Sequence, residues 1–415
     1  MKPVLSRSWL ALLGPGILVA ATGVGAGDLL TASLAGSKVG ITLVLAAAIG
    51  ALLKWTLNEG VARWQMATDT TILEGWSSRL GVWVRWVFLI YFLLWSFFVG
   101  GALINACGIA GDAFWRLGEA GTSRAIWGVA HSLIGLALVW IGGFKLLERL
   151  MSVCIAGMFV SVLVTALLLP HDWSALASEF TNPSLSQAAL PWALAVMGGV
   201  GGTVTLLSYG YWIREAGRSG ASGLADCRID LAVAYVATAL FGVAMILIGT
   251  RIEVEGSSAD VALKLAEQLG QALGPAGKWL FLVGFWGAVF SSLLGVWQSA
   301  PYLFADFLVI TRGQKPPEKL AATTPYRIYL VAIAFVPMPL LWLKVEQVQL
   351  AYAVMGALFM PLLAFTLLIM NNRRDWVGDR FRNGWLINGL LIATLVLIAA
   401  FGILQLVGYV PKTAA

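Results

Sequence analysis

Eleven apolar runs, each long enough to cross a lipid bilayer as a helix, constrain this chain more than any other feature of its sequence. They cover approximately residues 10–36, 40–62, 84–108, 124–142, 149–169, 187–212, 229–250, 277–303, 326–344, 347–371 and 386–409. A helix needs about 20 apolar residues to cross the hydrocarbon core. Only 12% of the residues are charged, about half the share in a soluble domain. The sequence therefore predicts an all-α integral membrane protein in which residues 1–415 form one domain. The only long polar segments are expected at about 251–276 and 305–325.

The distribution of Lys and Arg residues predicts how the chain is inserted. About two thirds of the 27 basic residues fall in segments on the side of the N-terminus, and cytoplasmic loops carry an excess of Lys and Arg. We therefore expect a multi-pass protein of the cell (inner or plasma) membrane with its N-terminus in the cytoplasm. Because the number of spans is odd, the C-terminus is expected outside. The first run begins at Trp9 and is long enough to span, which argues against a cleaved signal peptide.

Several classes of function lack the residues that they need. The cysteines, Cys107, Cys154 and Cys227, show neither CxxC nor metal-ligand spacing. The two histidines, His131 and His171, lie near predicted helix ends. No GxxxxGKS or GxxxxGKT loop is present, which excludes an ATP-driven pump. The net charge of +6 sits in short loops and gives no basis for nucleic-acid binding. We expect no enzymatic activity, no cofactor, and a monomer in the lipid bilayer.

Two of the spans are interrupted by glycine clusters. Residues 22–28 read TGVGAGD and residues 198–204 read GGVGGTV. Each interior glycine costs a helix about 1 kcal/mol relative to alanine. The clusters lie five spans apart, and Gly-interrupted segments in corresponding halves of a transporter indicate a substrate site built from discontinuous helices. The alternative is that Gly23, Gly25 and Gly27 form a packing face between helices.

Asp28 is the charged residue of the first cluster. A carboxylate in mid-membrane is costly unless it faces a cavity or a partner. At a helix break, unwound carbonyls accept cations, and the end of a half-helix carries part of the helix dipole. Asp28 is therefore expected either to coordinate a cation or to N-cap the second half of the interrupted span, and the two roles are compatible.

Five motifs carry a resemblance to one transporter family. They are GPG at 14–16, LAGSKVG at 34–40, ARWQMATDTTILEGW at 62–76, KLLERLMSVCIAGM at 145–158 and RIDLAVAYV at 228–236. In this order, over roughly the first 240 residues, the chain resembles the Nramp (natural-resistance-associated macrophage protein) transporters. The resemblance implies a leucine-transporter-like fold with two inverted five-helix repeats, over residues 10–169 and 187–371, and an extra helix over 386–409. It also implies a substrate site between spans 1 and 6, both unwound at mid-membrane.

The chain departs from that family where the family binds transition metals. Members that carry such metals have Asp-Pro-Gly-Asn in the first break and Met-Pro-His in span 6. Here residues 25–28 read GAGD and residues 205–207 read TLL. The metal-binding aspartate is thus replaced by Gly25, the sulfur ligand by Thr205, and the histidine linked to proton movement is missing. Span 3, over residues 88–111, contains none of the acidic residues that serve the family as a proton route.

These departures predict a site of oxygen ligands for a hard cation. Thioether sulfur favours transition metals, whereas hydroxyl, carbonyl and carboxylate oxygens suit Mg²⁺, Ca²⁺ or Mn²⁺. The candidate ligands are Asp28, Thr205 and the backbone at Gly25 and Gly202. The residues expected along the substrate path are Thr22, Ala26, Thr203, Ser208, Asn105 and Gln298. For the last two, packing between helices is the alternative.

Three further charged residues are candidates for a gate. Glu59 and Arg63 are four residues apart on span 2 and therefore share one helix face; a charge-paired helix end is the alternative. Arg214 closes span 6 and is expected either to pair with Asp226 or Asp230 or to lie in a solvated loop.

The function that these features favour is secondary-active or facilitative transport of an inorganic cation by alternating access. The oxygen ligands favour a hard divalent ion such as Mg²⁺ or Mn²⁺, without the usual proton coupling. One alternative is transport of a small organic solute, an amino acid or amine whose ammonium group pairs with Asp28, since one fold hosts many functions. The other is a non-transporting, receptor-like relic.

Overall fold

The computed structural model describes residues 9–170, 172–181, 186, 189–199, 202–251, 258–314, 317 and 319–406, and all regular structure within these ranges is helical. The helices are α1 (Trp9–Gly23), α2 (Ala26–Val39), α3 (Val44–Thr68), α4 (Ile72–Gly75), α5 (Val82–Phe114), α6 (Ala120–Leu168), α7 (Trp173–Thr181), α8 (Leu190–Gly199), α9 (Ser208–Glu215), α10 (Gly220–Gly249), α11 (Ser258–Thr311), α12 (Thr324–Phe335), α13 (Val345–Met370), α14 (Arg374–Val377) and α15 (Trp385–Leu406). The short turns η4 (Val204–Leu207) and η6 (Met338–Trp342) follow α8 and α12.

The described helices include seven segments that are long and apolar enough to cross a membrane. These are Ile41–Thr68, Val82–Phe114, Ala120–Gly143, Lys145–Leu168, Gly220–Gly249, Leu273–Thr311 and Thr324–Trp342. Shorter apolar helices cover Gly14–Gly23, Phe359–Met370 and Trp385–Ala400. The spans follow the predicted order, and spans 4 and 5 join at Gly143, whose φ of 62° ends the first half of α6. The total of eleven membrane crossings stays a prediction.

One polar segment between spans is partly helical. Residues 251–276 were expected to form a long polar stretch between spans, and α11 begins within it at Ser258. Gly274, with a φ of 75°, separates this first part of α11 from the membrane span that follows. The predicted division into repeats over 10–169 and 187–371, with an extra helix over 386–409, stays a prediction; residues 187, 188 and 407–409 lie outside the described residues.

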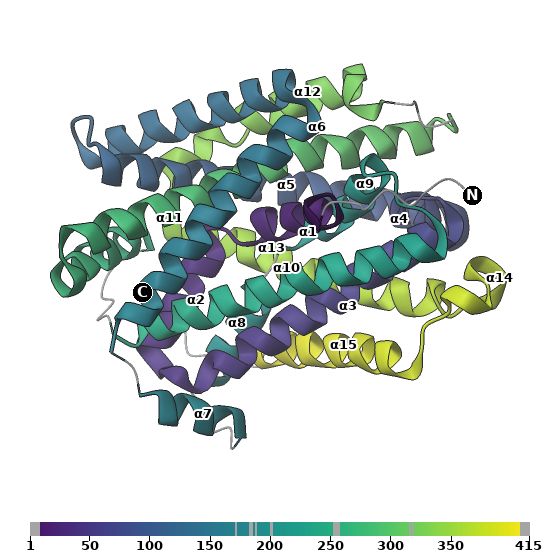
Figure 1. Cartoon of the computed structure of the whole chain (residues 1–415). Coiled ribbons are helices and arrows are strands. Elements are labelled where there is room, and N and C mark those ends of the chain that lie inside the picture. The colour runs from purple at the N-terminus through teal and green to yellow at the C-terminus, as the bar shows by residue number, and fades with distance from the viewer. Residues whose placement is uncertain are drawn as a thin grey trace.

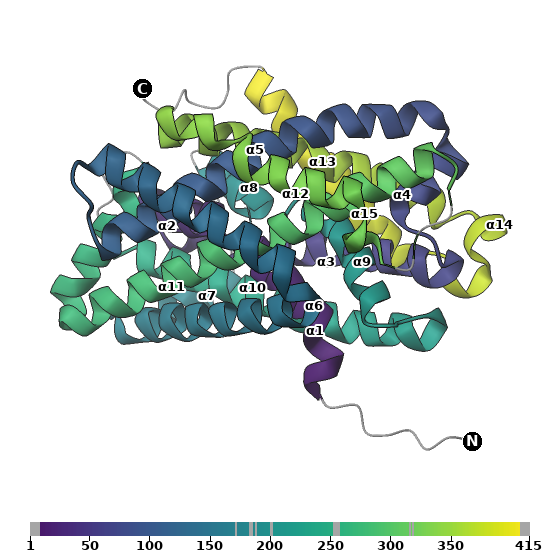
Figure 2. The ribbon, with the colours of Figure 1, turned by 90° about the horizontal axis from the view of Figure 1, so that it is seen from above.

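The long helices lie side by side and α1 enters among them (Figure 1). Figure 2 shows the start of α1 projecting from one face of the molecule, beside α6 and α10. Deeper in the molecule α1 packs on α6, α10 and α11. The pair α14 and α15 lies at the periphery, where α15 contacts α13 and α3.

Exposed and buried side chains are distributed as a bilayer requires. Large apolar residues are exposed on the outer faces of the long helices, among them Trp140, Ile141 and Val236. Polar groups lie inside: Lys54 and Glu59 of α3 are fully buried. Because lipid cannot hydrogen-bond to polar groups, this arrangement fits a protein whose apolar outer surface faces lipid and whose polar residues face one another.

Candidate transport site

The predicted break in the first span is confirmed. Helix α1 ends at Gly23 and α2 begins at Ala26, so that only residues 24 and 25 lie between them. The Val24 N–H still donates to the Ala20 carbonyl at 2.8 Å, and the Leu29 N–H donates to the Gly25 carbonyl at 3.1 Å. The interruption is therefore short, and the helical hydrogen bond to the Ala20 carbonyl still reaches its first residue.

The predicted break in span 6 is confirmed as well, and it faces the first. Helix α8 ends at Gly199 and η4 begins at Val204. Gly202 has a φ of 81°, a left-handed conformation that glycine adopts without steric cost. A Cβ atom at Gly202 would lie 3.4 Å from the Gly23 Cα and 2.6 Å from the Thr205 Oγ1. The two breaks therefore lie in direct contact, with Thr205 beside them.

The predicted ligands whose surroundings the structure describes lie at the two breaks. Thr205 is buried. A Cβ atom at Gly25 would lie 2.9 Å from the Ser292 Oγ of α11. Helix α11 therefore lies close to the position at which the metal-binding members of the resembling family carry a carboxylate. Asp28 is the third residue of α2 rather than the residue before the helix. The side chains of Asp28 and Ala26 lie outside what the structure describes.

Three predicted path residues are also found at the breaks. The Thr203 Oγ1 accepts a hydrogen bond of 3.0 Å from the Trp95 Nε1 of α5. The hydroxyl oxygens of Thr22 and Ser208 are buried and have no hydrogen-bond partner among the described residues. Among the side chains that the structure describes, no three His, Cys, Asp or Glu residues come together. Hydroxyl oxygens of three predicted path residues thus lie at or next to the breaks.

The other two path residues lie in contacts between helices. The Asn105 Nδ2 donates to the carbonyls of Gly101 at 3.0 Å and Leu340 at 3.3 Å. Asn105 is ten residues beyond Trp95 on α5, roughly 15 Å along the helix. The Gln298 Oε1 accepts from the Trp212 Nε1 at 2.8 Å, which joins α11 to α9. The structure therefore favours the packing alternative for both residues.

The predicted pair of Glu59 and Arg63 is present and has a third member. The Arg63 Nε donates to the Glu59 Oε2 at 3.2 Å, and the Arg228 Nε of α10 donates to the Glu59 Oε1 at 2.9 Å. The Arg63 Nη1 also donates to the carbonyls of Phe381 and Arg382, at 3.2 and 3.0 Å. This cluster joins α3, α10 and the segment after α14; Glu59 and Arg63 are buried in it, whereas the Arg228 side chain is about half exposed.

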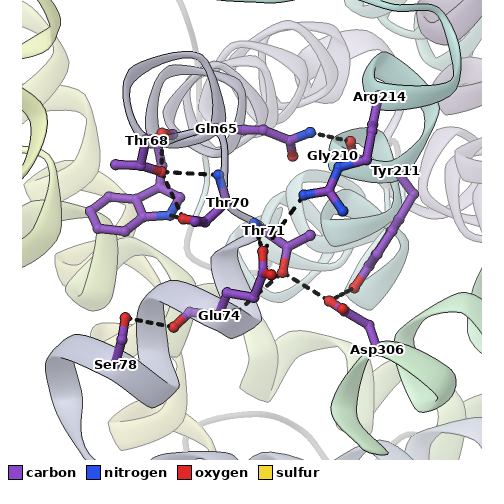
Figure 3. Close-up of polar contacts among 11 residues, drawn as sticks. Gln65, Thr68, Thr70, Thr71, Glu74, Ser78, Gly210, Tyr211, Arg214 and Asp306 are labelled. Atoms are coloured by element: carbon purple, nitrogen blue, oxygen red, sulfur yellow. Dashed lines mark hydrogen bonds and ion pairs between the residues drawn. The ribbon is translucent and has the colours of Figure 1, made fainter. Parts of the chain in front are cut away.

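Arg214 was expected either to pair with Asp226 or Asp230 or to lie in a solvated loop, but it lies in the last turn of α9 and has a different carboxylate partner. The Arg214 Nη2 lies 3.6 Å from the Glu74 Oε2 of α4. Glu74 caps α4 reciprocally with Thr71, whose hydroxyl donates to the Asp306 Oδ2 at 2.8 Å. The Tyr211 hydroxyl donates to the same oxygen at 2.7 Å. Figure 3 shows these side chains converging from α4, α9 and α11.

Asp230 belongs instead to a cluster that the sequence analysis missed. Its Oδ2 accepts from the Arg218 Nη1 at 2.7 Å and from the Tyr209 hydroxyl at 3.0 Å. Its Oδ1 accepts from the Gly16 N–H at 2.9 Å. The cluster therefore fastens the first part of α1 to α9 and α10. The GPG motif and the aspartate of RIDLAVAYV were visible in the sequence, but their contact was not.

A buried ammonium group beside the second break was missed as well. The Lys54 Nζ donates to the Gly198 carbonyl at 2.8 Å, and Lys54 is fully buried. Gly198 lies in the last turn of α8, where the helix dipole favours a positive charge. The lysine thus joins α3 to the end of the first half of span 6.

Comparisons with known proteins agree with this architecture. The model of the family "Natural resistance-associated macrophage protein-like" (Nramp) matches residues 16–408. A crystal structure of the Eremococcus coleocola manganese transporter, in complex with an aromatic bis-isothiourea compound, is similar at a TM-score of 0.80 and 17% identity; the match covers 100% of this chain and 91% of that one. At this identity the likeness shows the fold.

Two more distant structures share the fold. The structure of MhsT in complex with L-phenylalanine has a TM-score of 0.61 at 16% identity, and the match covers 96% of this chain and 98% of that one. A Na⁺-coupled sialic acid symporter has a TM-score of 0.61 at 9% identity, with 95% and 89% covered. No curated protein sequence matches the chain.

Proposed function

This chain belongs to the Nramp family, and on that premise we propose that it moves an inorganic divalent cation across a membrane by alternating access at the two facing helix breaks. The observation that carries the proposal is the contact of Gly202 with Gly23, which brings the unwound parts of spans 1 and 6 together in the interior. Discontinuous helices that meet in this way place backbone carbonyls and half-helix ends around one point.

The donors around the breaks support a hard ion. Thr205 and Thr203 provide hydroxyl oxygens there, and Asp28 follows the first break in the sequence. Oxygen donors suit Mg²⁺ or Mn²⁺ better than softer transition metals. We propose Asp28 as the carboxylate ligand, with Thr205 and the backbone at Gly25 and Gly202 completing the site. One carboxylate suits an ion that keeps part of its water shell.

Two charged clusters, one of them centred on the buried Glu59, are proposed as the gate at the cytoplasmic end. Arg214 and Glu74 join α9 to α4, and Glu59 joins Arg63 to Arg228. Opening a path between these helices requires the contacts to separate, so that their strength sets how readily that end opens. The excess of basic residues on the side of the N-terminus supports the assignment of this side to the cytoplasm.

Transport is proposed to run without the usual proton coupling. Residues 88–111 of α5 contain no acidic residue, and Leu207 stands where the family's histidine is expected. Without an acidic residue in this part of α5, a proton has no carboxylate carrier in this span. A pH gradient across the membrane is therefore expected to leave the rate of uptake unchanged.

Calorimetric titration of the purified protein with Mg²⁺ and Mn²⁺ tests the ion site. We expect saturable heat with at least one ion, and binding weakened at least about tenfold in Asp28→Asn, because the variant removes the charge that attracts the ion. Asp112→Asn is the matched control: Asp112 pairs with Arg116 at the end of α5, away from the breaks, and the variant is expected to bind as the wild type does. Heat with an amino acid or amine and with neither metal would instead favour the organic solute.

A further inference from the structure

Five oxygen atoms gather where the end of α1 lies against α11. The Ser291 Oγ is 3.1 Å from the carbonyl oxygens of both Ala21 and Ala288. The Ser292 Oγ is 3.3 Å from the Ala21 carbonyl oxygen and 3.1 Å from that of Val24. Each of the five residues is at most 2% exposed. We call these atoms the five-oxygen cluster.

The five-oxygen cluster has fewer protons than contacts. A serine hydroxyl carries one hydrogen, and a carbonyl oxygen only accepts. Two hydroxyl protons therefore serve at most two of the four oxygen–oxygen contacts at a time, and the other two bring lone pairs together in a buried place. Oxygen atoms that approach each other with no hydrogen between them repel electrostatically, and the low dielectric of a buried place strengthens the repulsion. A positive ion among the five atoms would satisfy all of them at once.

We propose that the five-oxygen cluster binds a monovalent cation of the size of Na⁺. All five ligands are neutral, and a buried divalent ion without any carboxylate would lose far more hydration energy than neutral oxygens return. In an octahedral shell, neighbouring ligands are separated by √2 times the metal–oxygen distance. Separations of 3.1–3.3 Å thus correspond to a metal–oxygen distance of roughly 2.2–2.3 Å, longer than the about 2.0–2.1 Å of Mg²⁺.

The position of the cluster in the fold favours a positive charge. Ala21 lies in the last turn of α1, where the helix dipole places partial negative charge. One turn further along α11, Gly295 packs so closely against Thr22 that a Cβ atom there would overlap the Thr22 Oγ1. The buried Thr22 hydroxyl, which has no hydrogen-bond partner among the described residues, thus lies on the same contact between α1 and α11 and offers a further oxygen nearby.

Occupation of the cluster would hold α1 against α11. The carbonyls of Ala21 and Val24 come from the broken first span and the two hydroxyls from span 8, so that an ion bound by both sets stabilises only conformations in which these helices touch. The inference goes beyond the proposed function, because it requires neither Asp28 nor a divalent substrate. Failure of one proposal leaves the other intact.

Thermal unfolding of the purified full chain in matched NaCl, KCl and choline chloride tests the proposal. At Na⁺ concentrations about 100 times Kd, we expect Tm to be roughly 3 °C or more higher in NaCl than in choline chloride, since an ion that binds the folded state stabilises it. KCl is expected to raise Tm little, because K⁺ is too large for the spacing. In the Ser291→Ala and Ser292→Ala variants, the Na⁺ concentration that gives half of the maximal increase in Tm is expected to rise at least tenfold.

Ser299→Ala is the matched control, because Ser299 is a buried serine of the same helix, outside the cluster. It is expected to keep the full Na⁺-dependent shift. Equal Tm values of the wild type in NaCl and KCl would overturn the proposal, and this result does not depend on any variant. Wild-type Na⁺ sensitivity in both cluster variants would overturn it too. Each variant is compared with itself in choline chloride, so that a general loss of stability does not imitate the effect.

Discussion

Replacing Arg218 by glutamine is expected to lower the free energy of unfolding by about 3–5 kcal/mol, because it leaves the carboxylate of Asp230 buried without a counter-charge. The Arg218 Nη1 lies 2.7 Å from the Asp230 Oδ2, and the two side chains are 2% and 0% exposed. The remaining donors to Asp230, the Gly16 N–H and the Tyr209 hydroxyl, are neutral. Denaturant unfolding in detergent, followed by circular dichroism, measures the loss.

The double variant Arg218→Gln/Asp230→Asn separates the lost charge balance from lost packing. With no carboxylate left, it is expected to recover most of the stability that the single variant loses. Arg116→Gln is the matched control, because Arg116 pairs with Asp112 but is half exposed; exposed pairs contribute little. A single variant as stable as the wild type, or a double variant no more stable than the single one, would contradict the assignment of Arg218 and Asp230 as a buried ion pair.

Replacing Gly202 by alanine is expected to reduce uptake at least about tenfold while the protein remains folded. A side chain in the left-handed conformation costs roughly 1–2 kcal/mol, and the new Cβ would lie 2.6 Å from the Thr205 Oγ1. Either the backbone of the break or Thr205 must therefore move, and the ligand geometry changes with it. Uptake into proteoliposomes measures the loss, and size-exclusion chromatography verifies that the variant is folded.

Gly198→Ala is the matched control for that variant. Gly198 lies four residues earlier in the last turn of α8, and a Cβ atom there would meet no other atom within 4 Å. It keeps the carbonyl that Lys54 binds, and it replaces glycine by a better helix former. Uptake is expected to match that of the wild type. If Gly202→Ala transports as fast as Gly198→Ala, the break in span 6 is not the site.

The sequence was most informative where a pattern is local. Apolar runs predicted the order of the spans, because the bilayer requires about 20 apolar residues in succession. The breaks at 24–25 and before Val204 followed from glycines that a helix disfavours. The pairing of Glu59 with Arg63 followed from their spacing on one helix face. Each of these signals lies within a few residues of the feature that it predicts.

Contacts between distant segments were not predictable in this way. Arg214 has carboxylates nearby in the sequence at Asp226 and Asp230, yet its partner is Glu74 of α4, because helix packing decides which side chains face each other. Serines in apolar helices commonly donate to their own backbone, so that Ser291 and Ser292 gave no sign of their contact with α1. The helix over 258–273 was missed because its polarity resembles that of a loop.

Uptake of Mg²⁺ and Mn²⁺ into proteoliposomes that contain an ion indicator and a luminal pH dye tests the central claim most directly. The account predicts saturable entry of at least one of these ions, loss of that entry in Asp28→Asn, wild-type entry in Asp112→Asn, and no change of luminal pH as the ion enters. Entry no faster than into liposomes without protein, or an Asp28→Asn variant as fast as the wild type, would contradict a cation site at the paired helix breaks.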